Sequence, residues 1–389
     1  MSAHPADEKI LHRALEVARG GIGLASPNPY VGAVIAGPRR NIVGSGTYTY
    51  AGVKHAEILA LEQAGDKARG GTLYINLEPH AHQGRTPPCT DALIAAGIRR
   101  VVAAMADPNP LVSGRGFEQL RAAGVQVEVG FLEVEARRLN EGFARYIRKG
   151  LPLVTLKSAM TLDGKIAPSP GKQRDEAART GGFSGQWITG ELARAHVHEL
   201  RHEHDALITG IGTILADNPL LTDRSGLPRR RPLLRVVLDS CLRLPLESRL
   251  VQDAAKKRDN DVLVFCSSPE GEKQSQLEQL GIRVAKVSGA ADGRIDLRAV
   301  LAHLGQLEIT RAMIEAGSAI NNAALSSDVV DKVFLYYAPK ILAEAGSIPF
   351  ASTNNFASST FPLRVKQVHT HRFGDDFAVE GYLRDPYGD

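Results

Sequence analysis

The sequence is poor in cysteine and in aromatic residues, and it has no long apolar run. Its 389 residues include three cysteines and one tryptophan, and aromatic residues make up 5%. A low, odd cysteine count in a long chain argues against a disulfide framework and favours a reducing compartment. No segment approaches the roughly 18 apolar residues of a membrane-spanning helix, and the polar start MSAHPADEKI is unlike a secretory signal. We therefore expect a cytoplasmic protein without a membrane partner.

The sequence also lacks a strong charge of either sign. Lys and Arg number 47 against 43 Asp and Glu, which gives a formal net charge of +4. This balance tolerates phosphate-ester substrates but does not favour nucleic acid as a partner. The densest basic run, PRRRP at residues 228–232, lies between two prolines and is predicted to be a solvated loop.

The pattern along the chain is an alternation of apolar strand-like and helix-like segments, which predicts an α/β fold with helices on both faces of a sheet. In the first half we expect strands at 30–37, 71–78, 99–106 and 125–130, and helices at 55–65, 90–97, 115–124 and 133–150. In the second half we expect strands at 151–160, 205–212, 233–240, 261–268, 333–342 and 377–384, a helix at 192–204, and a strand–turn–helix at 312–325.

The length suits two domains, and the Gly-Leu-Pro sequence after residue 149 places their boundary near residue 148. We therefore expect domains at residues 1–147 and 148–389. The segment from Pro168 to Ser184 is rich in Pro, Gly, Lys and Arg, which is typical of a flexible insertion.

Three side chains in the first half form a candidate metal site. His55 opens a predicted helix, His80 follows a predicted strand, and Cys89 opens another helix after Pro87-Pro88. A helix start favours the thiolate that a metal needs, and three protein ligands leave the fourth zinc position for water. Glu57, two residues after His55, is then the candidate general acid and base. Zinc deaminases have this arrangement: a histidine and two further residues bind the zinc, and a glutamate that is not a ligand transfers protons.

The first half resembles the deaminase domain of the bifunctional riboflavin-biosynthesis deaminase/reductases (RibD-type). The resemblance is carried by SPNPYVGAVI, HAEILAL and LEPHAHQGRTPPCTDALIAAGI. It implies a cytidine-deaminase-like α/β/α sandwich that holds Zn²⁺. The separations between His55, His80 and Cys89 fit the family pattern.

Three positions depart from that pattern. His80 stands where the family usually has cysteine, Tyr48 where it often has histidine, and Ala81 where serine is common. Imidazole is a good zinc ligand, so we expect the site still to bind zinc. By resemblance, Asn28 holds the pyrimidine, and His82 and Arg85 hold the ribose phosphate.

The second half resembles the family's reductase domain, which has a dihydrofolate-reductase-like fold. The shared motifs include LKSAMTLDGKIA, LITGIGTILADNPLLTDR and MIEAGSAINNAAL. The resemblance implies that NADPH is held by Ala159, Trp187, Thr213, Asp217, Ser240, Gly317, Ser318, Ala319, Ile320, Asn321, Asn322 and Ala323. It implies that substrate is held by Arg201, Leu221, Arg224 and Glu315. Taken on their own residues, Trp187 also suits core packing and Arg201 a solvated helix face.

The resemblance implies two consecutive reactions and a homo-oligomer. The first is hydrolytic deamination of 2,5-diamino-6-ribosylamino-4(3H)-pyrimidinone 5′-phosphate. The second is reduction of the ribosyl group to ribityl by NADPH, since no side chain supplies hydride. Three alternatives stay open: a reductase with a degenerate deaminase domain, a deaminase of nucleic-acid bases, and a binding scaffold without enzyme activity.

Overall fold

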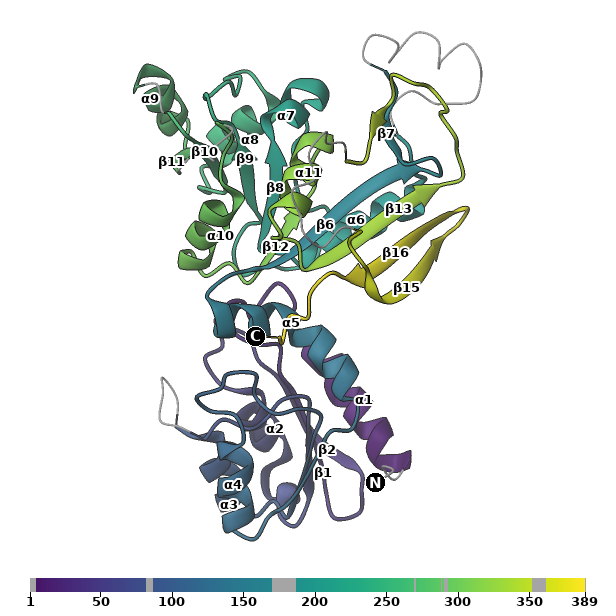
Figure 1. Ribbon diagram of the computed structural model, residues 1–389. Coiled ribbons are helices and arrows are strands. Elements are labelled where there is room, and N and C mark those ends of the chain that lie inside the picture. The colour runs from purple at the N-terminus through teal and green to yellow at the C-terminus, as the bar shows by residue number, and fades with distance from the viewer. Residues whose placement is uncertain are drawn as a thin grey trace. The chain divides into compact units, whose positions relative to one another are not determined.

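The computed structural model describes residues 5–81, 87–169, 187–268, 271–287, 289, 293–351 and 362–388. The chain divides into two compact units (Figure 1). The first comprises Met1–Gly150 together with the short segment Pro228–Arg231 and the last residue, and the second comprises Leu151–Leu227 and Pro232–Gly388.

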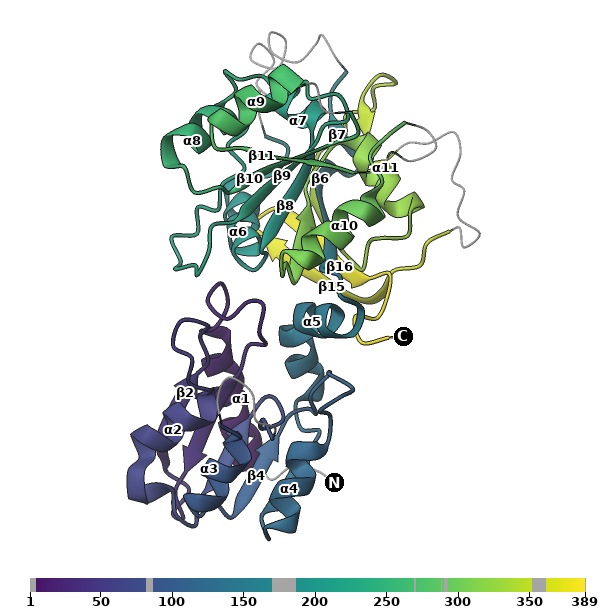
Figure 2. The same ribbon diagram turned by 90° about the vertical axis from the view of Figure 1, so that its left-hand side faces the viewer.

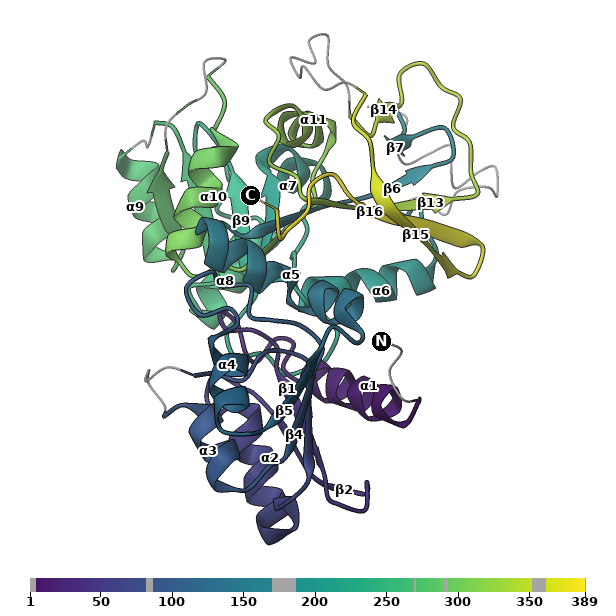
Figure 3. The same cartoon turned by 60° about the horizontal axis from the view of Figure 1, so that its bottom comes forward.

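The first unit is a sheet with the strand order β2-β1-β3-β4-β5. β2 and β1 pair antiparallel, β1 and β3 pair antiparallel, and β3, β4 and β5 run parallel. Helices α1 and α5 lie on one face of this sheet, and α2, α3 and α4 lie on the other (Figure 3). The bounds are α1 Pro5–Arg19, β1 Gly32–Ala36, β2 Ile42–Thr47, α2 Ala56–Ala64, β3 Thr72–Ile75, α3 Cys89–Ala95, β4 Arg100–Ala103, α4 Arg115–Ala122, β5 Gln126–Val129 and α5 Glu133–Lys149, with a 3₁₀ turn at Gly65–Ala68.

Two glycines of β2 let helix α2 approach the sheet closely. A Cβ at Gly44 would lie 2.1 Å from the carbonyl oxygen of Ala60, and one at Gly46 would lie 2.2 Å from that of Ala56. Any side chain at these positions would push the helix away from the strand. The two glycines therefore set the position of the helix that carries Glu57.

The second unit is built on a larger sheet with the strand order β11-β10-β9-β8-β12-β6-β13-β16-β15. The strands from β11 to β13 in this order run parallel. β16 runs antiparallel to both of its neighbours, β13 and β15. The strands are β6 Leu153–Thr161, β8 Ala206–Gly210, β9 Leu234–Leu238, β10 Val262–Cys266, β11 Arg283–Lys286, β12 Arg311–Ile314, β13 Lys332–Ala338, β15 Lys366–Phe373 and β16 Asp376–Tyr382, with a small pair formed by β7 Lys165–Ala167 and β14 Ile348–Pro349.

Apolar side chains cover both faces of this sheet, in agreement with the alternating sequence pattern. One core forms under α6 Glu191–His202, α7 Ile211–Asp217, α8 Arg249–Lys257 and α9 Gly271–Gln279. The other forms under α10 Leu297–Gln306 and α11 Ser318–Ser326. Figure 2 shows α10 and α11 on the face opposite to α6 and α8. Neighbouring residues such as Leu207 and Ile208 point into opposite cores.

The strand order reverses at the centre of the second sheet. The chain runs from β8 outward through β9 and β10 to β11, then returns as β12 between β8 and β6. The segments that follow β8, β9 and β12 therefore lie at the same edge of the sheet, where open α/β sheets bind ligands.

The α/β fold class is confirmed, and so are the strands and helices expected from hydrophobic periodicity. Strands β2, β7, β11, β14 and β15 and helices α7 to α10 were not expected from the sequence. The expected insertion at 168–184 lies outside the described residues, apart from Pro168 and Ser169. None of the helices in the described ranges is long and apolar enough to cross a membrane.

Candidate metal centre and nucleotide-binding edge

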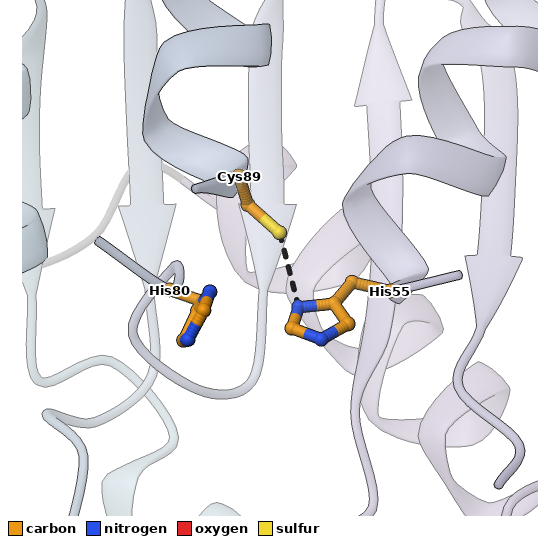
Figure 4. Close-up of side chains that lie close together, drawn as sticks. All are labelled: His55, His80 and Cys89. Atoms are coloured by element: carbon orange, nitrogen blue, oxygen red, sulfur yellow. Dashed lines mark hydrogen bonds between the residues drawn. The ribbon is translucent and has the colours of Figure 1, made fainter. Parts of the chain in front are cut away.

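Three predicted ligands meet at the carboxyl end of β3. His55 is the residue that precedes α2, His80 lies on the loop after β3, and Cys89 is the first residue of α3. Their ligand atoms all lie within 4.8 Å of one another. Nδ1 of His55 is 3.1 Å from Sγ of Cys89, and the ring of His80 faces both (Figure 4).

The spacing and chemistry of these donors fit a zinc ion. Zinc–nitrogen bonds of about 2.0 Å and zinc–sulfur bonds of about 2.3 Å place tetrahedral ligands roughly 3.3–3.8 Å apart. The distance from His55 Nδ1 to Cys89 Sγ, 3.1 Å, is slightly shorter than this range. All pairs of ligand atoms lie within 4.8 Å, so small side-chain movements would bring them to it. Two imidazoles and one thiolate are all accepted zinc ligands, and three ligands leave one position open.

Glu57 is buried beside this cluster, with 3% of its surface exposed. Its carboxylate accepts hydrogen bonds from the Cys89 side chain and from the backbone N–H of His80. Burial raises the pKa of Glu57, and the nearby His55 opposes that rise. A buried carboxyl with a raised pKa that touches the metal ligands is suited to moving protons.

The protonation of Cys89 differs from the expectation drawn from its helix start. Burial, followed by the neighbouring Glu57 carboxylate, raises the pKa of the Cys89 thiol. Burial and Glu57 therefore outweigh the lowering of the thiol pKa that was expected from the start of the short helix α3. A divalent cation between the ligands would reverse the balance, because its charge deprotonates a coordinating thiol.

The loop that carries His80 is held by buried polar side chains that the sequence reasoning missed. Both oxygens of Glu78 accept backbone hydrogen bonds, from Asp107 and Gly114 on one side and from Gly116 on the other. The backbone N–H groups of Cys89 and Thr90 donate to the carbonyl of His80, at 2.8 and 3.2 Å. The start of α3 and the His80 loop are thus fixed to each other.

Asn28 lies on the loop that leads into β1, at the same end of the sheet. Its Nδ2 donates to the Tyr48 hydroxyl at 2.5 Å. The Tyr48 ring packs edge-on against His55, with 5.7 Å between ring centroids. Tyr48, one of the departures from the family pattern, therefore connects Asn28, which is expected to hold the pyrimidine, to the candidate metal ligand His55.

The basic run at 228–232 is a loop, as predicted, but its three arginines are less solvated than expected. Arg229, Arg230 and Arg231 are each half-buried, and the structure assigns them to the first unit. The Arg230 guanidinium lies 3.6 Å from the centroid of the Tyr50 ring and donates to the carbonyl of Ser26. The sequence alone had no signal for partners some 200 positions away.

The remaining residues proposed for the first site, His82 and Arg85, lie outside the described residues.

In the second unit, Glu315 and Arg201 form one ion-pair cluster with Lys157. Glu315 follows β12, and its Oε1 accepts from Nζ of Lys157 at 2.8 Å. Its Oε2 accepts from Nε and an NH2 group of Arg201, at 3.1 and 2.8 Å. Burial alone would raise the pKa of Glu315, but the two cations outweigh it and lower the pKa to about 2. Lys157, inside an apolar strand, was missed by the sequence reasoning.

The other two substrate candidates, Leu221 and Arg224, flank Thr222, which contacts this cluster. Arg201 also donates to the carbonyl of Thr222 at 2.9 Å. Nε of Arg224 donates to the Thr222 hydroxyl at 3.3 Å, and Leu221 is buried with a left-handed backbone. Arg201 is therefore not a solvated helix residue; its side chain is only 13% exposed.

Most of the cofactor candidates lie where three adjacent parallel strands end. Thr213 and Asp217 lie on α7 after β8, and Ser240 follows β9. The segment Gly317–Ala323 begins α11 after β12. Backbone N–H groups at such strand-to-helix turns can bind a phosphate. Ala159, on β6 next to β12, completes this edge.

Three of the cofactor candidates also make contacts within the protein. Asn321 is fully buried and donates to the carbonyl of Phe350 at 2.8 Å, so it supports the turn from inside. Ile320 packs closely on Gly210. Trp187 is 55% exposed with the Arg194 guanidinium 5.2 Å from its ring centroid, which excludes plain core packing.

Comparison with known proteins supports both halves of this description. Residues 4–105 match the family of the cytidine and deoxycytidylate deaminase zinc-binding region, and residues 152–379 match the RibD C-terminal domain. The chain is 39% identical over 373 residues to the riboflavin biosynthesis protein RibD of Aquifex aeolicus, covering 96% of this chain and 97% of that protein. It is 38% identical to the RibD protein of Actinobacillus pleuropneumoniae, covering 98% and 96%.

Solved structures give the same result. A structure of Acinetobacter baumannii RibD matches with a TM-score of 0.81 and 34% identity, covering 97% of this chain and 98% of the other. The Thermotoga maritima diaminohydroxyphosphoribosylaminopyrimidine deaminase/5-amino-6-(5-phosphoribosylamino)uracil reductase matches with a TM-score of 0.79 and 35% identity, covering 97% and 98%. This chain therefore belongs to the RibD family of bifunctional riboflavin-biosynthesis enzymes, with a zinc-dependent deaminase followed by an NADPH-dependent reductase.

Proposed function

We propose that residues 1–147 deaminate 2,5-diamino-6-ribosylamino-4(3H)-pyrimidinone 5′-phosphate and that residues 148–389 then reduce the ribosyl group of the product to ribityl. Support comes from the metal-ligand geometry of the first unit, the phosphate-suited edge of the second, and the activities named for the Thermotoga maritima relative.

In the deaminase, His55, His80 and Cys89 would hold the zinc. Zinc, when bound, supplies the Lewis acidity that makes a water molecule nucleophilic at neutral pH. Glu57 accepts a proton from that water and delivers it to the amino group, which leaves the ring as ammonia. Asn28, oriented by Tyr48, holds the pyrimidine, and His82 and Arg85 hold the ribose phosphate.

In the reductase, the segment Gly317–Ala323 with Ala159, Trp187, Thr213, Asp217 and Ser240 would hold the cofactor. NADPH, when bound, supplies the hydride that reduces the anomeric carbon of the sugar. Lys157, Arg201 and Glu315 carry two positive charges and one negative charge, so the cluster has a net positive charge. That charge, with Arg224 and Leu221 beside it, suits a ribose phosphate ester.

We further propose that the enzyme acts in the cytoplasm as a homo-oligomer. Cys89, Cys241 and Cys266 all lie outside disulfides, which suits a reducing compartment.

The observation that carries the proposal is the convergence of His55, His80 and Cys89 on one point with Glu57 buried beside them. We expect Glu57→Gln to slow ammonia release by about 10²–10⁴-fold, since that is the usual contribution of a general acid and base. The measurement is ammonia release from the diaminopyrimidinone ribosyl phosphate by zinc-loaded protein without NADPH.

NADPH oxidation on the deaminated uracil substrate is the internal control, and it should be unchanged in Glu57→Gln. If the unmodified chain oxidises NADPH on that substrate but never releases ammonia, the proposal fails. The chain is then a reductase with a degenerate deaminase domain.

A further inference from the structure

The loop at residues 23–30, called here the Asn28 loop, is tied down at both ends. At its second end, Tyr30 is held by two buried asparagines. Its N–H donates to Oδ1 of Asn140 at 2.8 Å, and its carbonyl accepts from Nδ2 of Asn76 at 2.8 Å. This end is anchored by residues from α5 and from the end of β3.

At its first end, the Asn28 loop is held by Arg230. The backbone N–H of Arg230 donates to the carbonyl of Gly23 at 2.8 Å. The guanidinium donates to the carbonyl of Ser26, and NH2 of the adjacent Arg231 donates to Oγ of Ser26 at 3.2 Å. Ser26 is only 5% exposed. A charged donor that meets a buried carbonyl in this way makes one of the stronger hydrogen bonds of a protein.

The Arg230 guanidinium also contacts Tyr50, which is hydrogen-bonded to the Asn28 loop. It lies over the Tyr50 ring, 3.6 Å from the centroid, and the N–H of Tyr50 donates to the carbonyl of Leu24 at 3.1 Å. Tyr50 is two residues after Tyr48, whose hydroxyl accepts from Asn28. Arg230 therefore contacts both chain segments that set the position of the Asn28 carboxamide.

We propose that Arg230 is a positioning residue of the deaminase site, which holds the Asn28 loop against Tyr50 so that Asn28 can bind the pyrimidine. The site is then completed by a residue from the second half of the sequence. This inference rests on the proposed pyrimidine-binding role of Asn28. In this role Arg230 acts through its contacts with Ser26 and Tyr50.

The test replaces Arg230 by methionine, which keeps an unbranched stem and removes the guanidinium with its charge and its donors. Arg13→Met is the matched control, because Arg13 is an exposed residue of α1 that pairs only with Glu16 in the described residues. We expect the KM for the diaminopyrimidinone to rise roughly tenfold in Arg230→Met, since a loosened loop weakens binding of substrate and transition state alike. The kcat and the zinc content should stay close to those of the unmodified chain.

Arg230→Lys separates positioning from folding. Lysine keeps a cation over Tyr50 but lacks the planar fork, so its KM should lie between those of the unmodified chain and Arg230→Met. An unchanged KM in Arg230→Met with full zinc content overturns the inference. The inference is also overturned if Arg230→Met and Arg230→Lys both lose kcat and zinc while KM stays unchanged. That result would show that Arg230 has a purely structural role. If Arg230→Met does not fold, Arg230→Lys decides by the same criteria.

Failure of the proposed function is distinguishable from failure of this inference. Equilibrium binding of the diaminopyrimidinone to Glu57→Gln protein needs no turnover. If the unmodified chain releases no ammonia, the deaminase role fails, while the dissociation constants with and without Arg230→Met still decide the role of Arg230. Equal constants contradict it.

Discussion

Two glutamates, one in each unit, have opposite electrostatic surroundings: Glu57 is buried and Glu315 is partly buried. Glu57 is buried next to His55, His80 and Cys89, and burial raises its pKa against the opposing effects of His55 and of the hydrogen bonds to its carboxylate. Glu315 is also desolvated, but Lys157 and Arg201 outweigh burial and lower its pKa to about 2. The same type of side chain is therefore suited to exchanging a proton in one unit and is charged at neutral pH in the other.

The difference shows what each site still needs. Around Glu57 the acidic groups, including the Cys89 thiol, have raised pKa values, and a cation would relieve all of them at once. Around Glu315 one carboxylate is shared by two cations, Lys157 and Arg201. The first arrangement suits a metal and the second suits a phosphate.

Glu315→Gln should have the largest effect on the difference between the two glutamates, and this effect should be on the stability of the second unit. Removing the carboxylate leaves Lys157 and Arg201 partly buried without their common partner, and breaking such a pair costs about 3 kcal/mol. We expect this loss in the free energy of unfolding of the second unit alone. Hydrogen exchange read by mass spectrometry, peptide by peptide, measures it for β6 and β12 and, as internal reference, for β3 and β4.

Glu199→Gln is the matched control, because Glu199 is an exposed residue on the same helix as Arg201. It should change stability by less than about 0.5 kcal/mol. Equal effects of the two substitutions would show that the ion-pair cluster contributes nothing specific.

The smaller expected effect is a dependence of the second unit on acid. The pKa of Glu315 falls from an ordinary 4.5 to about 2 on folding. A depressed carboxyl pKa adds stability above the ordinary value, and that stability is lost as the pH falls from 4.5 toward 2. We expect a loss of roughly 2 kcal/mol from this group. Urea unfolding of the second unit across that pH range measures this loss. In Glu315→Gln the free energy of unfolding should depend less on pH; an unchanged dependence would assign the loss to other acids.

Periodicity predicted the parts of the fold in which apolar side chains decide the structure. The five-residue strands Leu234–Leu238 and Val262–Cys266 are buried throughout, and both were expected. β2 was missed because IVGSGT contains the glycines that α2 packs against, so its sequence lacks a strand pattern. β15 was missed because it is an edge strand whose side chains are mostly exposed, which leaves its sequence polar.

The candidate site was predictable where its residues lie close to a motif. His55, Glu57, His80 and Cys89 were all proposed from short patterns, and the ligands do converge. Lys157 and Arg230 could not be found in this way, since their partners are far away in the sequence: Glu315 is 158 positions from Lys157, and Ser26 is 204 positions from Arg230. Only folding brings such pairs together.

The most direct test of the account is the zinc content of the purified chain and of His80→Ala. Elemental analysis after removal of loosely bound metal should give about one zinc per chain in the unmodified protein. The value should be the same in Cys241→Ala, which removes an exposed cysteine, and at least tenfold lower in His80→Ala and Cys89→Ala. Full zinc content in His80→Ala, or none in the unmodified chain, would contradict the assignment of His55, His80 and Cys89 as the metal centre.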